Sequence, residues 1–298
     1  MSARRLVAVL FLAALPGLIW FFMSEKEQQI EPNNLLASYP LQRTIKYSFV
    51  LRNPSARLVD HATFWAYAPV QQTTHQYVAA ISASYPYKLD RDHVGNQRMQ
   101  FDVGTLPPFG SRLVDVQVDL RFSREPNKTV LTSEEMLSAQ IYVELNAPEL
   151  QRTAKFLDKH NPSKTARATY DWVRVMIKNQ GYVAKDRGAL YALTHREGDC
   201  SEQMYLYTAL ARLNRLPTVG VAGFPMKESG ILRAVQLHNW AEVRLDDDWL
   251  VVDTDRNTFA SNSTDYLAFH VLVGDSKYQG NGAQQMFGGD DGLVIAMN

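Results

Sequence analysis

The sequence has few of the residues that build disulfide frameworks and metal centres. Cysteine occurs once in 298 residues, at position 200, so no internal disulfide can form. The seven histidines form no His-x-x-x-His or His-Glu-x-x-His pattern, which argues against a metalloenzyme. Lysine and arginine together number 31, as do aspartate and glutamate, so the basic excess typical of nucleic-acid-binding proteins is missing. We therefore expect no cofactor, no metal and no nucleic-acid partner.

One long hydrophobic run is present near the N-terminus. Leu6–Met23 contains no charged side chain and follows Arg4 and Arg5. A helix of about 20 apolar residues spans a bilayer, and the basic flank predicts a cytoplasmic N-terminus. Trp20–Met23 occupies the place where a cleavage site needs small residues, which favours an uncleaved signal anchor over a cleaved signal peptide. The expected location is the bacterial inner membrane, single-pass, with the folded part in the periplasm.

The chain beyond this run divides into a tether and two folded regions. Its length makes two domains the expectation. Residues 1–26 are the expected signal anchor, and the polar residues 27–40 are the tether. Apolar and polar residues alternate within 41–130, most clearly in Val114–Phe122, which predicts half-buried strands and a β-sandwich domain. Helical periodicity follows, and 131–298 form the expected catalytic domain.

The single cysteine is predicted to begin a helix. Asp199 is a good N-cap residue, and Glu202 three positions later completes a capping-box pattern. A helix N-terminus stabilises a thiolate, so we expect the pKa of Cys200 to lie below that of a free thiol. The alternative is a small buried thiol without function. An unpaired thiol is a liability in an oxidising compartment, which favours a thiol that is used.

A base for the thiol, and a carboxylate to orient that base, are both found between Gln236 and Asp255. This stretch is typical of two strands joined by an aspartate-rich turn. In the register of a two-residue turn, His238 and Asp253 share a face as diagonal neighbours, about 7–8 Å apart at the backbone. Asp255 lies on the same face, so strand alternation alone does not choose between the two carboxylates. With Cys200, these residues give the chain order Cys, His, Asp of a possible triad.

Several motifs together resemble the transglutaminase-like superfamily. In chain order they are Gly198-Asp199-Cys200, Ala209–Leu213, Leu216–Val219, His238–Val243 and Trp249–Thr254. Carried over residue by residue, the resemblance matches Cys200 to the nucleophile, His238 to the base and Asp253 to the orienting carboxylate. It implies an α+β fold with a papain-like core, in which the cysteine helix packs on an antiparallel sheet. Asn239 departs from the pattern, because many members have a small residue there.

The resemblance implies a thiol-dependent acyl-transfer enzyme that acts on amide bonds of peptide or protein substrates. A peptidase or amidase is favoured; a cross-linking transglutaminase, or a non-catalytic module that binds peptides or polymers of the cell envelope, remains the alternative. The backbone N–H of Cys200 is one expected oxyanion donor, and Gln180 or Tyr182 is expected to supply the second. The glycine- and aspartate-rich run at 288–291 is interpreted as a surface loop.

Overall fold

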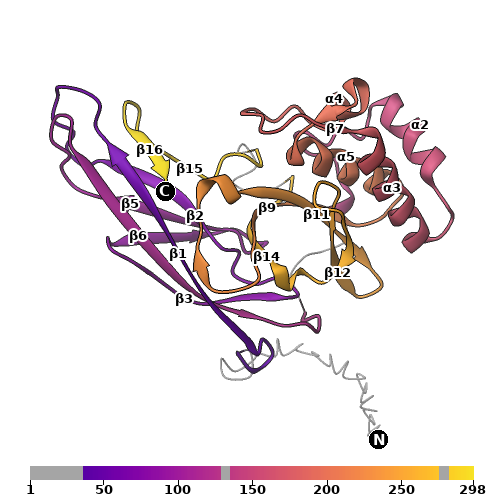
Figure 1. Ribbon diagram of the computed structural model, residues 1–298, viewed down its shortest axis with the longest axis horizontal. Helices are drawn as coiled ribbons and strands as arrows, with labels where there is room; N and C mark the ends of the chain where they lie inside the picture. Colours follow the sequence, from indigo (N-terminus) through magenta and orange to yellow (C-terminus); the bar gives the residue numbers. More distant parts are fainter. Residues whose placement is uncertain (1–35, 129–134, 275–281) are drawn as a thin grey trace, which may run out of the picture. The chain divides into compact units, whose positions relative to one another are not determined.

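The computed structural model describes residues 36–128, 135–274 and 282–298 (Figure 1). The expected membrane anchor and the expected boundary between residues 130 and 131 lie outside the described residues. Among those described, no helix is long and apolar enough to cross a membrane. The described residues all belong to one compact unit.

A β-rich region of two sheets comes first in the chain. One sheet contains β1 (Leu41–Arg52), β3 (Gln76–Ala83) and β6 (Ser111–Phe122); the other contains β2 (Thr63–Ala68), β4 (Tyr87–Arg91) and β5 (Gln97–Asp102). The predicted alternation is present, since Val114, Val116 and Val118 are buried between more exposed neighbours. The sheets share a core, in which the rings of Phe49 and Phe64 lie 5.6 Å apart. A β-rich region before the core is therefore confirmed.

The end of the chain adds one strand to each of these sheets. β15 (Phe287–Gly289) pairs with β2, and β16 (Val294–Met297) pairs with β1. The interpretation of the run at 288–291 as a surface loop is therefore wrong for Gly288 and Gly289, whereas Asp290 and Asp291 lie exposed beyond the strand. A Cβ at Gly288 would lie 2.9 Å from Nε1 of Trp65, so only glycine lets this strand approach β2 so closely. The turn is confined to the residues after β15, where Asp290 accepts a 2.8 Å hydrogen bond from the backbone N–H of Thr63.

The second region packs four helices on an antiparallel sheet. The helices are α2 (Pro148–Leu157), α3 (Pro162–Met176), α4 (Ala189–His195) and α5 (Cys200–Leu213). The sheet order is β13 (Thr258–Ser261), β12 (Asp248–Asp253), β11 (His238–Leu245), β9 (Thr218–Pro225) and β14 (Tyr266–Leu272). Short elements are β7 (Lys178–Asn179), β8 (Glu197–Gly198), η1 (Glu135–Leu137), η2 (Ala234–Gln236) and η3 (Ser263–Asp265). The short strand β10 (Gly230–Ile231) pairs with β1 of the first region.

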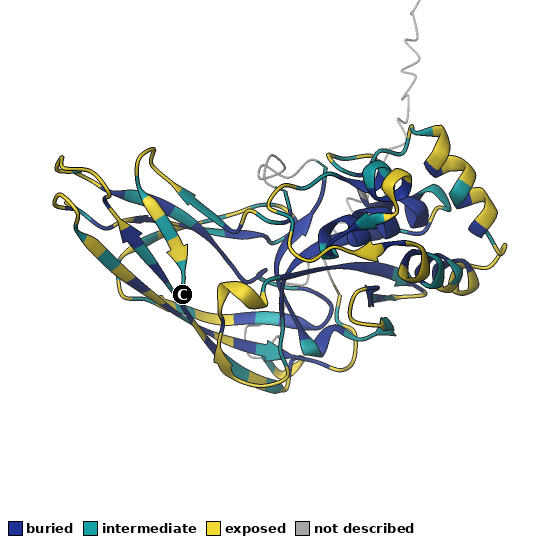
Figure 2. Cartoon of the chain, turned by 45° about the horizontal axis from the view of Figure 1, so that its top comes forward, coloured by how far each residue is buried: buried dark blue, intermediate teal, exposed yellow. Residues whose placement is uncertain are grey.

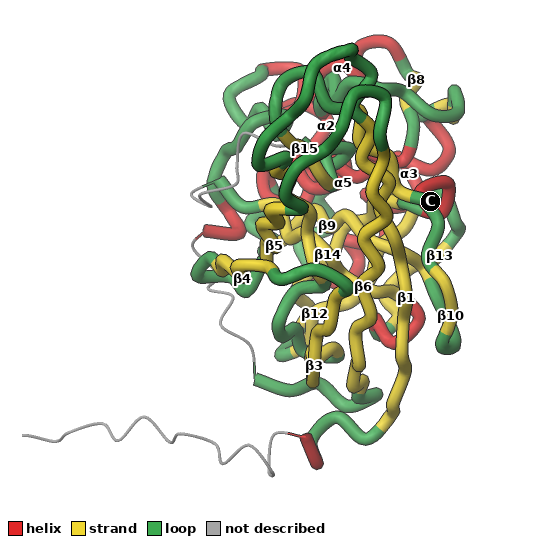
Figure 3. Tube along the Cα trace, turned by 90° about the vertical axis from the view of Figure 1, so that its left-hand side faces the viewer, coloured by secondary structure: helices red, strands yellow, loops and turns green. Residues whose placement is uncertain are grey.

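Helix α5 is the centre of this second region. It contacts α2, α3 and α4 as well as β9 and β11, and every residue from Ser201 to Arg212 is buried. A helix buried on all sides belongs inside a core, and Figure 2 shows the exposed residues on the outer helices instead. Figures 1 and 3 show the helices on one side of this sheet and the long strands β1 and β6 on the other. The observed fold is thus α+β and rich in sheet.

Two side-chain amides join the regions by pairing with the edge strand β14. Gln76 accepts from the N–H of Ala268 at 2.9 Å and donates to its carbonyl at 3.1 Å. Asn96 does the same at Val271, at 2.7 and 2.8 Å. The amides satisfy backbone groups that an exposed edge would offer to another strand. The β-rich region therefore fixes the strand whose first residue, Tyr266, reaches the site described next.

Candidate functional site

Cys200 is the first residue of α5, as predicted. The Asp199 side chain accepts a 2.8 Å hydrogen bond from the N–H of Ser201, and Glu202 accepts one of 3.1 Å from the N–H of Asp199. The bond from Asp199 to Glu202, together with one from the backbone N–H of Glu202 to the Asp199 side chain, forms the predicted capping box. A Cβ at Gly198 would overlap the Glu202 side chain, so glycine is required there. The sequence Gly-Asp-Cys thus places the sulfur at the beginning of a buried helix.

The thiol of Cys200 is neutral at physiological pH in this structure. Burial raises its pKa to about 12, and the charges of Asp199, Asp255 and Asp253 act in the same direction. A hydrogen bond from the backbone N–H of Asn239 favours the thiolate but does not compensate. The expectation of a lowered pKa is therefore wrong for this conformation. Desolvation and nearby carboxylates raise the pKa of Cys200 by more than the helix N-terminus lowers it.

A buried polar cluster supports the start of α5. Gln284, from the end of the chain, donates from Nε2 to Asp199 Oδ2 at 3.1 Å and to Ser201 Oγ at 2.7 Å. Arg187 forms a 3.2 Å ion pair with Glu202, whose side chain is fully buried. Sequence reasoning missed Gln284, because nothing in a lone glutamine so far from Cys200 indicates that the tail returns to this helix.

Asp186 completes this cluster. Burial raises its pKa to about 6, and the charges of Glu202 and Asp199 contribute to the rise. Its Oδ1 atom is buried and has no hydrogen-bond partner in the described part of the chain. Across residues 36–128, 135–274 and 282–298, no group of three or more His, Cys, Asp or Glu side chains is arranged to hold a metal ion.

The hairpin of β11 and β12 has the predicted register. Leu245 pairs with Asp248, and Asp246 in the turn has the positive φ of 55° that tight hairpins use. His238 Nε2 and Asp253 Oδ2 are 2.7 Å apart, and both side chains are buried. The short distance and burial make this a strong, charge-assisted contact.

Asp255 is not the partner of His238. β12 ends at Asp253 and the chain then turns, which leaves Asp255 exposed. Asp255 instead accepts a hydrogen bond from the side chain of Asn179. Asp253 also accepts from the N–H of Arg256 at 3.0 Å, so that both of its oxygens are occupied.

Asn239 connects this hairpin to the cysteine helix. Its Nδ2 atom donates to Ser201 Oγ at 2.9 Å and lies 3.7 Å from Cys200 Sγ. Its Oδ1 atom is buried without a partner among the described residues. The structure thus pairs His238 directly with Asp253 and brings the next residue, Asn239, to Cys200. Within the described ranges, no hydrogen bond joins Cys200 to His238.

The two side chains expected to supply an oxyanion donor face elsewhere. Gln180 accepts from the Arg187 guanidinium at 3.4 Å, and Tyr182 is 79% exposed. Neither forms a hydrogen bond with Cys200 in the part of the chain that the structure describes. The role of either as a second donor stays a prediction.

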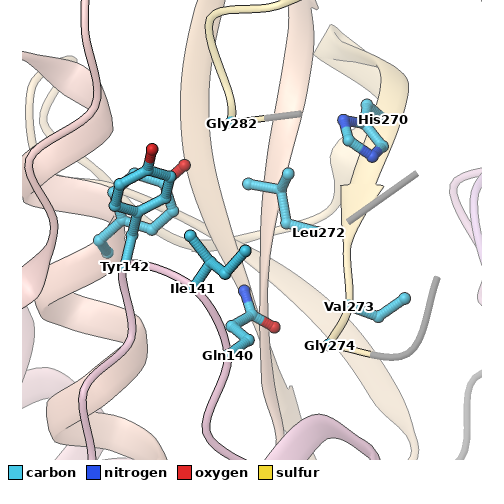
Figure 4. A pocket seen from close by; sticks show the side chains of 9 residues that line it. Gln140, Ile141, Tyr142, His270, Leu272, Val273, Gly274 and Gly282 are labelled. Carbon is cyan, nitrogen blue, oxygen red and sulfur yellow. The ribbon is translucent and has the colours of Figure 1, made fainter. Parts of the chain in front are cut away.

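The cavity in Figure 4 is separate from these residues. It is lined by nine residues, among them His270, Tyr142 and Gln140. His270 is buried, which lowers its pKa to about 3, and its ring stacks on Tyr67 at 4.4 Å. A neutral imidazole stacked on a tyrosine is core packing. None of Cys200, His238 and Asp253 lines this cavity.

Comparisons with known proteins concern the fold and one matched segment of the chain. Residues 151–254 match the family model described as the transglutaminase-like superfamily. A candidate cysteine protease from Cytophaga hutchinsonii has a TM-score of 0.59 at 15% identity, covering 87% of this chain and 90% of that chain. A candidate protease from Parabacteroides distasonis has a TM-score of 0.34 at 14% identity, covering 80% of this chain and 47% of that one. Red sea bream transglutaminase has a TM-score of 0.28 at 14% identity, covering 73% of this chain and 49% of that chain. None of the curated proteins matches the sequence.

The chain therefore contains a transglutaminase-like domain, and the expected resemblance is confirmed. The matched residues include Cys200, His238 and Asp253 but stop before β14 and Gln284. The likeness to the Cytophaga hutchinsonii protein covers most of both chains, so the β-rich region and the core occur together in a second protein of this fold.

Proposed function

We propose that this protein is a thiol-dependent acyl-transfer enzyme acting on amide bonds of peptide or protein substrates. Cys200 is the nucleophile, His238 the base and Asp253 the carboxylate that orients the base. The observation that carries the proposal is the buried 2.7 Å contact between His238 and Asp253. It lies on a hairpin whose Asn239 touches the sulfur of Cys200. Acyl transfer by a cysteine needs this combination of groups.

The hydrogen bond to Asp253 determines which imidazole nitrogen acts as the base. It holds a proton on Nε2 and leaves Nδ1 with a free lone pair. The thiol proton of Cys200 then passes to Nδ1 when a substrate binds, because burial keeps the resting thiol neutral. This step requires Nδ1 and Sγ to come within hydrogen-bond distance in the substrate complex, where such contacts commonly tighten.

The sulfur attacks the amide carbonyl carbon, and the carbonyl oxygen becomes an oxyanion. The backbone N–H of Cys200 stabilises it, since the first N–H groups of a helix have no acceptor within the helix. Collapse of this intermediate breaks the C–N bond, and His238 gives its proton to the departing amine. The acyl group stays on Cys200 as a thioester until water or a second amine attacks it.

The class of enzyme depends on whether water or a second amine accepts the acyl group from Cys200. Release to water makes a peptidase or amidase, which is our first proposal, and release to an amine makes a cross-linking transglutaminase. Incubating the full chain with a peptide library and a labelled primary amine separates them. We expect hydrolysed products that are absent with the Cys200→Ala variant. Amine incorporation without hydrolysis would support the transferase, and neither product would leave only a binding module.

We also propose that Leu6–Met23 anchors the protein in the inner membrane, with the catalytic domain in the periplasm. The support is the apolar run behind Arg4 and Arg5 and the absence of a small-residue cleavage site. Mass analysis of the chain in the membrane fraction tests this. We expect the N-terminal segment to be present. A mature chain beginning near Glu25 would show a cleaved signal peptide instead.

A further inference from the structure

Tyr266, the first residue of β14, reaches the carboxylate that orients His238. Its side chain is 7% exposed, and its hydroxyl donates to Asp253 Oδ2 at 3.0 Å. The same hydroxyl lies 3.2 Å from Thr258 Oγ1. A phenol has one proton and a carboxylate can only accept, so the proton points to Asp253 and the Thr258 hydroxyl donates to Tyr266.

Asp253 Oδ2 therefore receives two donors, one from β11 of the hairpin and one from the first residue of β14. One is His238 Nε2 at 2.7 Å and the other is the Tyr266 hydroxyl at 3.0 Å. Oδ1 accepts from the backbone N–H of Arg256. Three donors leave the carboxylate little freedom to rotate about its last bond, and rotation is the motion that would misalign Oδ2 and Nε2.

The Trp240 ring lies next to both the His238 ring and the Tyr266 ring, near-parallel to the first and tilted by 58° to the second. Its indole lies 6.5 Å from the His238 ring with an interplanar angle of 22°, and 5.0 Å from the Tyr266 ring. Aromatic rings at these distances pack favourably beyond the area they bury. Burial and the charge of Asp253 raise the pKa of Tyr266, so that its hydroxyl stays protonated and remains a donor at neutral pH.

Tyr266 also lines a hollow on the protein surface, whereas Asp253 does not. A surface hollow of about 770 Å³ is lined by ten residues, among them Tyr266, Thr258 and Arg256. Asp253 does not line it and is 1% exposed. The Tyr266 hydroxyl thus occupies the position from which a water molecule could compete with His238 for Oδ2.

We propose that Tyr266 is a positioning residue, which fixes Asp253 through its hydroxyl and so selects the His238 tautomer with its proton on Nε2. The catalytic consequence of this inference rests on the proposed function. The effect of Tyr266 on the His238 tautomer can be tested whether or not the protein turns over a substrate. Tyr266 lies beyond residues 151–254, which match the family model.

The direct test is the tautomer of His238 in the full chain with ¹⁵N-labelled histidine. The imidazole ¹⁵N shifts of the parent should report a proton on Nε2. In Tyr266→Phe the ring packing is kept and the donor is lost, so we expect a mixture of tautomers. Tyr39→Phe is the matched control, because Tyr39 is fully buried and its hydroxyl donates to Thr73 O at 2.8 Å and not to Asp253. An unchanged single tautomer in Tyr266→Phe would overturn the proposal.

A second variant tests whether misfolding of Tyr266→Phe could explain the result. Thr258→Val removes the donor to Tyr266 and should produce a smaller shift in the same direction. Shifts in Tyr39→Phe as large as those in Tyr266→Phe would mean that lost stability is the cause, and would also overturn the proposal.

Kinetics then connect the tautomer to catalysis. We expect kcat of Tyr266→Phe to fall about tenfold with KM within about twofold, as for a lost hydrogen bond to a charged group that acts in the transition state. A packing defect at the substrate site would raise KM instead. If Cys200→Ala kept its activity, the proposed function would fail, whereas the tautomer result would stand.

Discussion

In the described residues, the Asp253 carboxylate on the hairpin side of the candidate site is fully paired, and Asn239 Oδ1 is the buried atom of that strand without a partner. On the hairpin side, both oxygens of Asp253 are occupied, by His238, Tyr266 and Arg256. On the helix side, Asp186 Oδ1 and Arg187 Nε are buried without partners in the described residues. The thiol of Cys200 is neutral and only partly buried.

Under the proposed mechanism, this difference means that the proposed base, His238, is organised before a substrate binds and the proposed nucleophile, Cys200, is not. A carboxylate with three donors needs no rearrangement to hold the imidazole, which is the kind of preorganisation that lowers a barrier. The thiol, in contrast, must lose its proton against desolvation and three nearby carboxylates. Substitution of Asp253 should therefore slow chemistry without disturbing the resting protein.

The largest expected effect follows from removing the sulfur. Cys200→Ala should lower turnover by about 10⁵-fold or more, because loss of the nucleophile removes the covalent pathway. The thermal unfolding midpoint should stay within a few degrees of the parent, since the side chain is small and partly exposed. Substantial remaining turnover in a correctly folded variant would place the nucleophile elsewhere.

The hairpin side is tested next by two neighbouring aspartates. Asp253→Asn should keep the fold but disfavour the Nε2-protonated tautomer, costing about 10⁴-fold in kcat. Asp255→Asn is the matched control and should change kcat by less than about threefold, because Asp255 is exposed and bound to Asn179. The opposite ranking, with both variants melting like the parent, would assign the orienting role to Asp255.

The helix side is tested by the pH dependence of thiol labelling. Cys200 is the only cysteine, so iodoacetamide reports on it alone. Because burial raises the pKa of the thiol to about 12, its labelling rate should rise about tenfold per pH unit and still be rising at pH 10. A free thiol would level off above about pH 9.5. A rate that is already constant below pH 7 would mean a preformed thiolate and would remove the asymmetry between the two sides.

The smallest expected effect concerns Glu242, a buried carboxyl group of the hairpin that lowers the stability of the fold. Burial raises the pKa of Glu242, on β11, from 4.5 to about 7, and its side chain accepts a hydrogen bond from Trp240 Nε1 at 3.2 Å. The folded chain holds a proton that the unfolded chain has released, so this group makes stability fall as pH rises from 4.5 to about 7.

Glu242→Gln should remove that loss. Relative to the parent, the variant should gain about 1–3 kcal/mol between pH 4.5 and pH 7.5 in urea unfolding. Glu149→Gln, on the exposed face of α2, is the control and should show no such gain. An equal pH dependence in the parent and the Glu242→Gln variant would show that Glu242 ionises normally in the fold.

The parts that could be predicted from sequence are those set by nearby residues. The start of α5 follows from Asp199 and Glu202 within four positions, and the hairpin register follows from its two-residue turn. The pairing of His238 with Asp253 in place of Asp255 depends on where β12 ends, which strand alternation does not reveal.

The parts that could not be predicted come from distant segments. Gln284 and Tyr266 carry no local pattern, and they reach the site only because β14 and the chain end fold back onto it. In the sequence alone, Gly288 indicates a turn. Only the structure shows that it lies against Trp65. The raised pKa of Cys200 was missed for the same reason, because burial and the charges of Asp253 and Asp255 are tertiary properties.

The central claim is that Cys200 carries the acyl group during turnover. The most direct measurement is intact mass analysis of the full chain after brief exposure to p-nitrophenyl acetate, followed by peptide mapping. We expect one acetyl group on Cys200 in the parent and in Asp255→Asn, much slower acetylation in Asp253→Asn, and none in Cys200→Ala. Acetylation of another residue, or an equal rate in Asp253→Asn and the parent, would contradict the account.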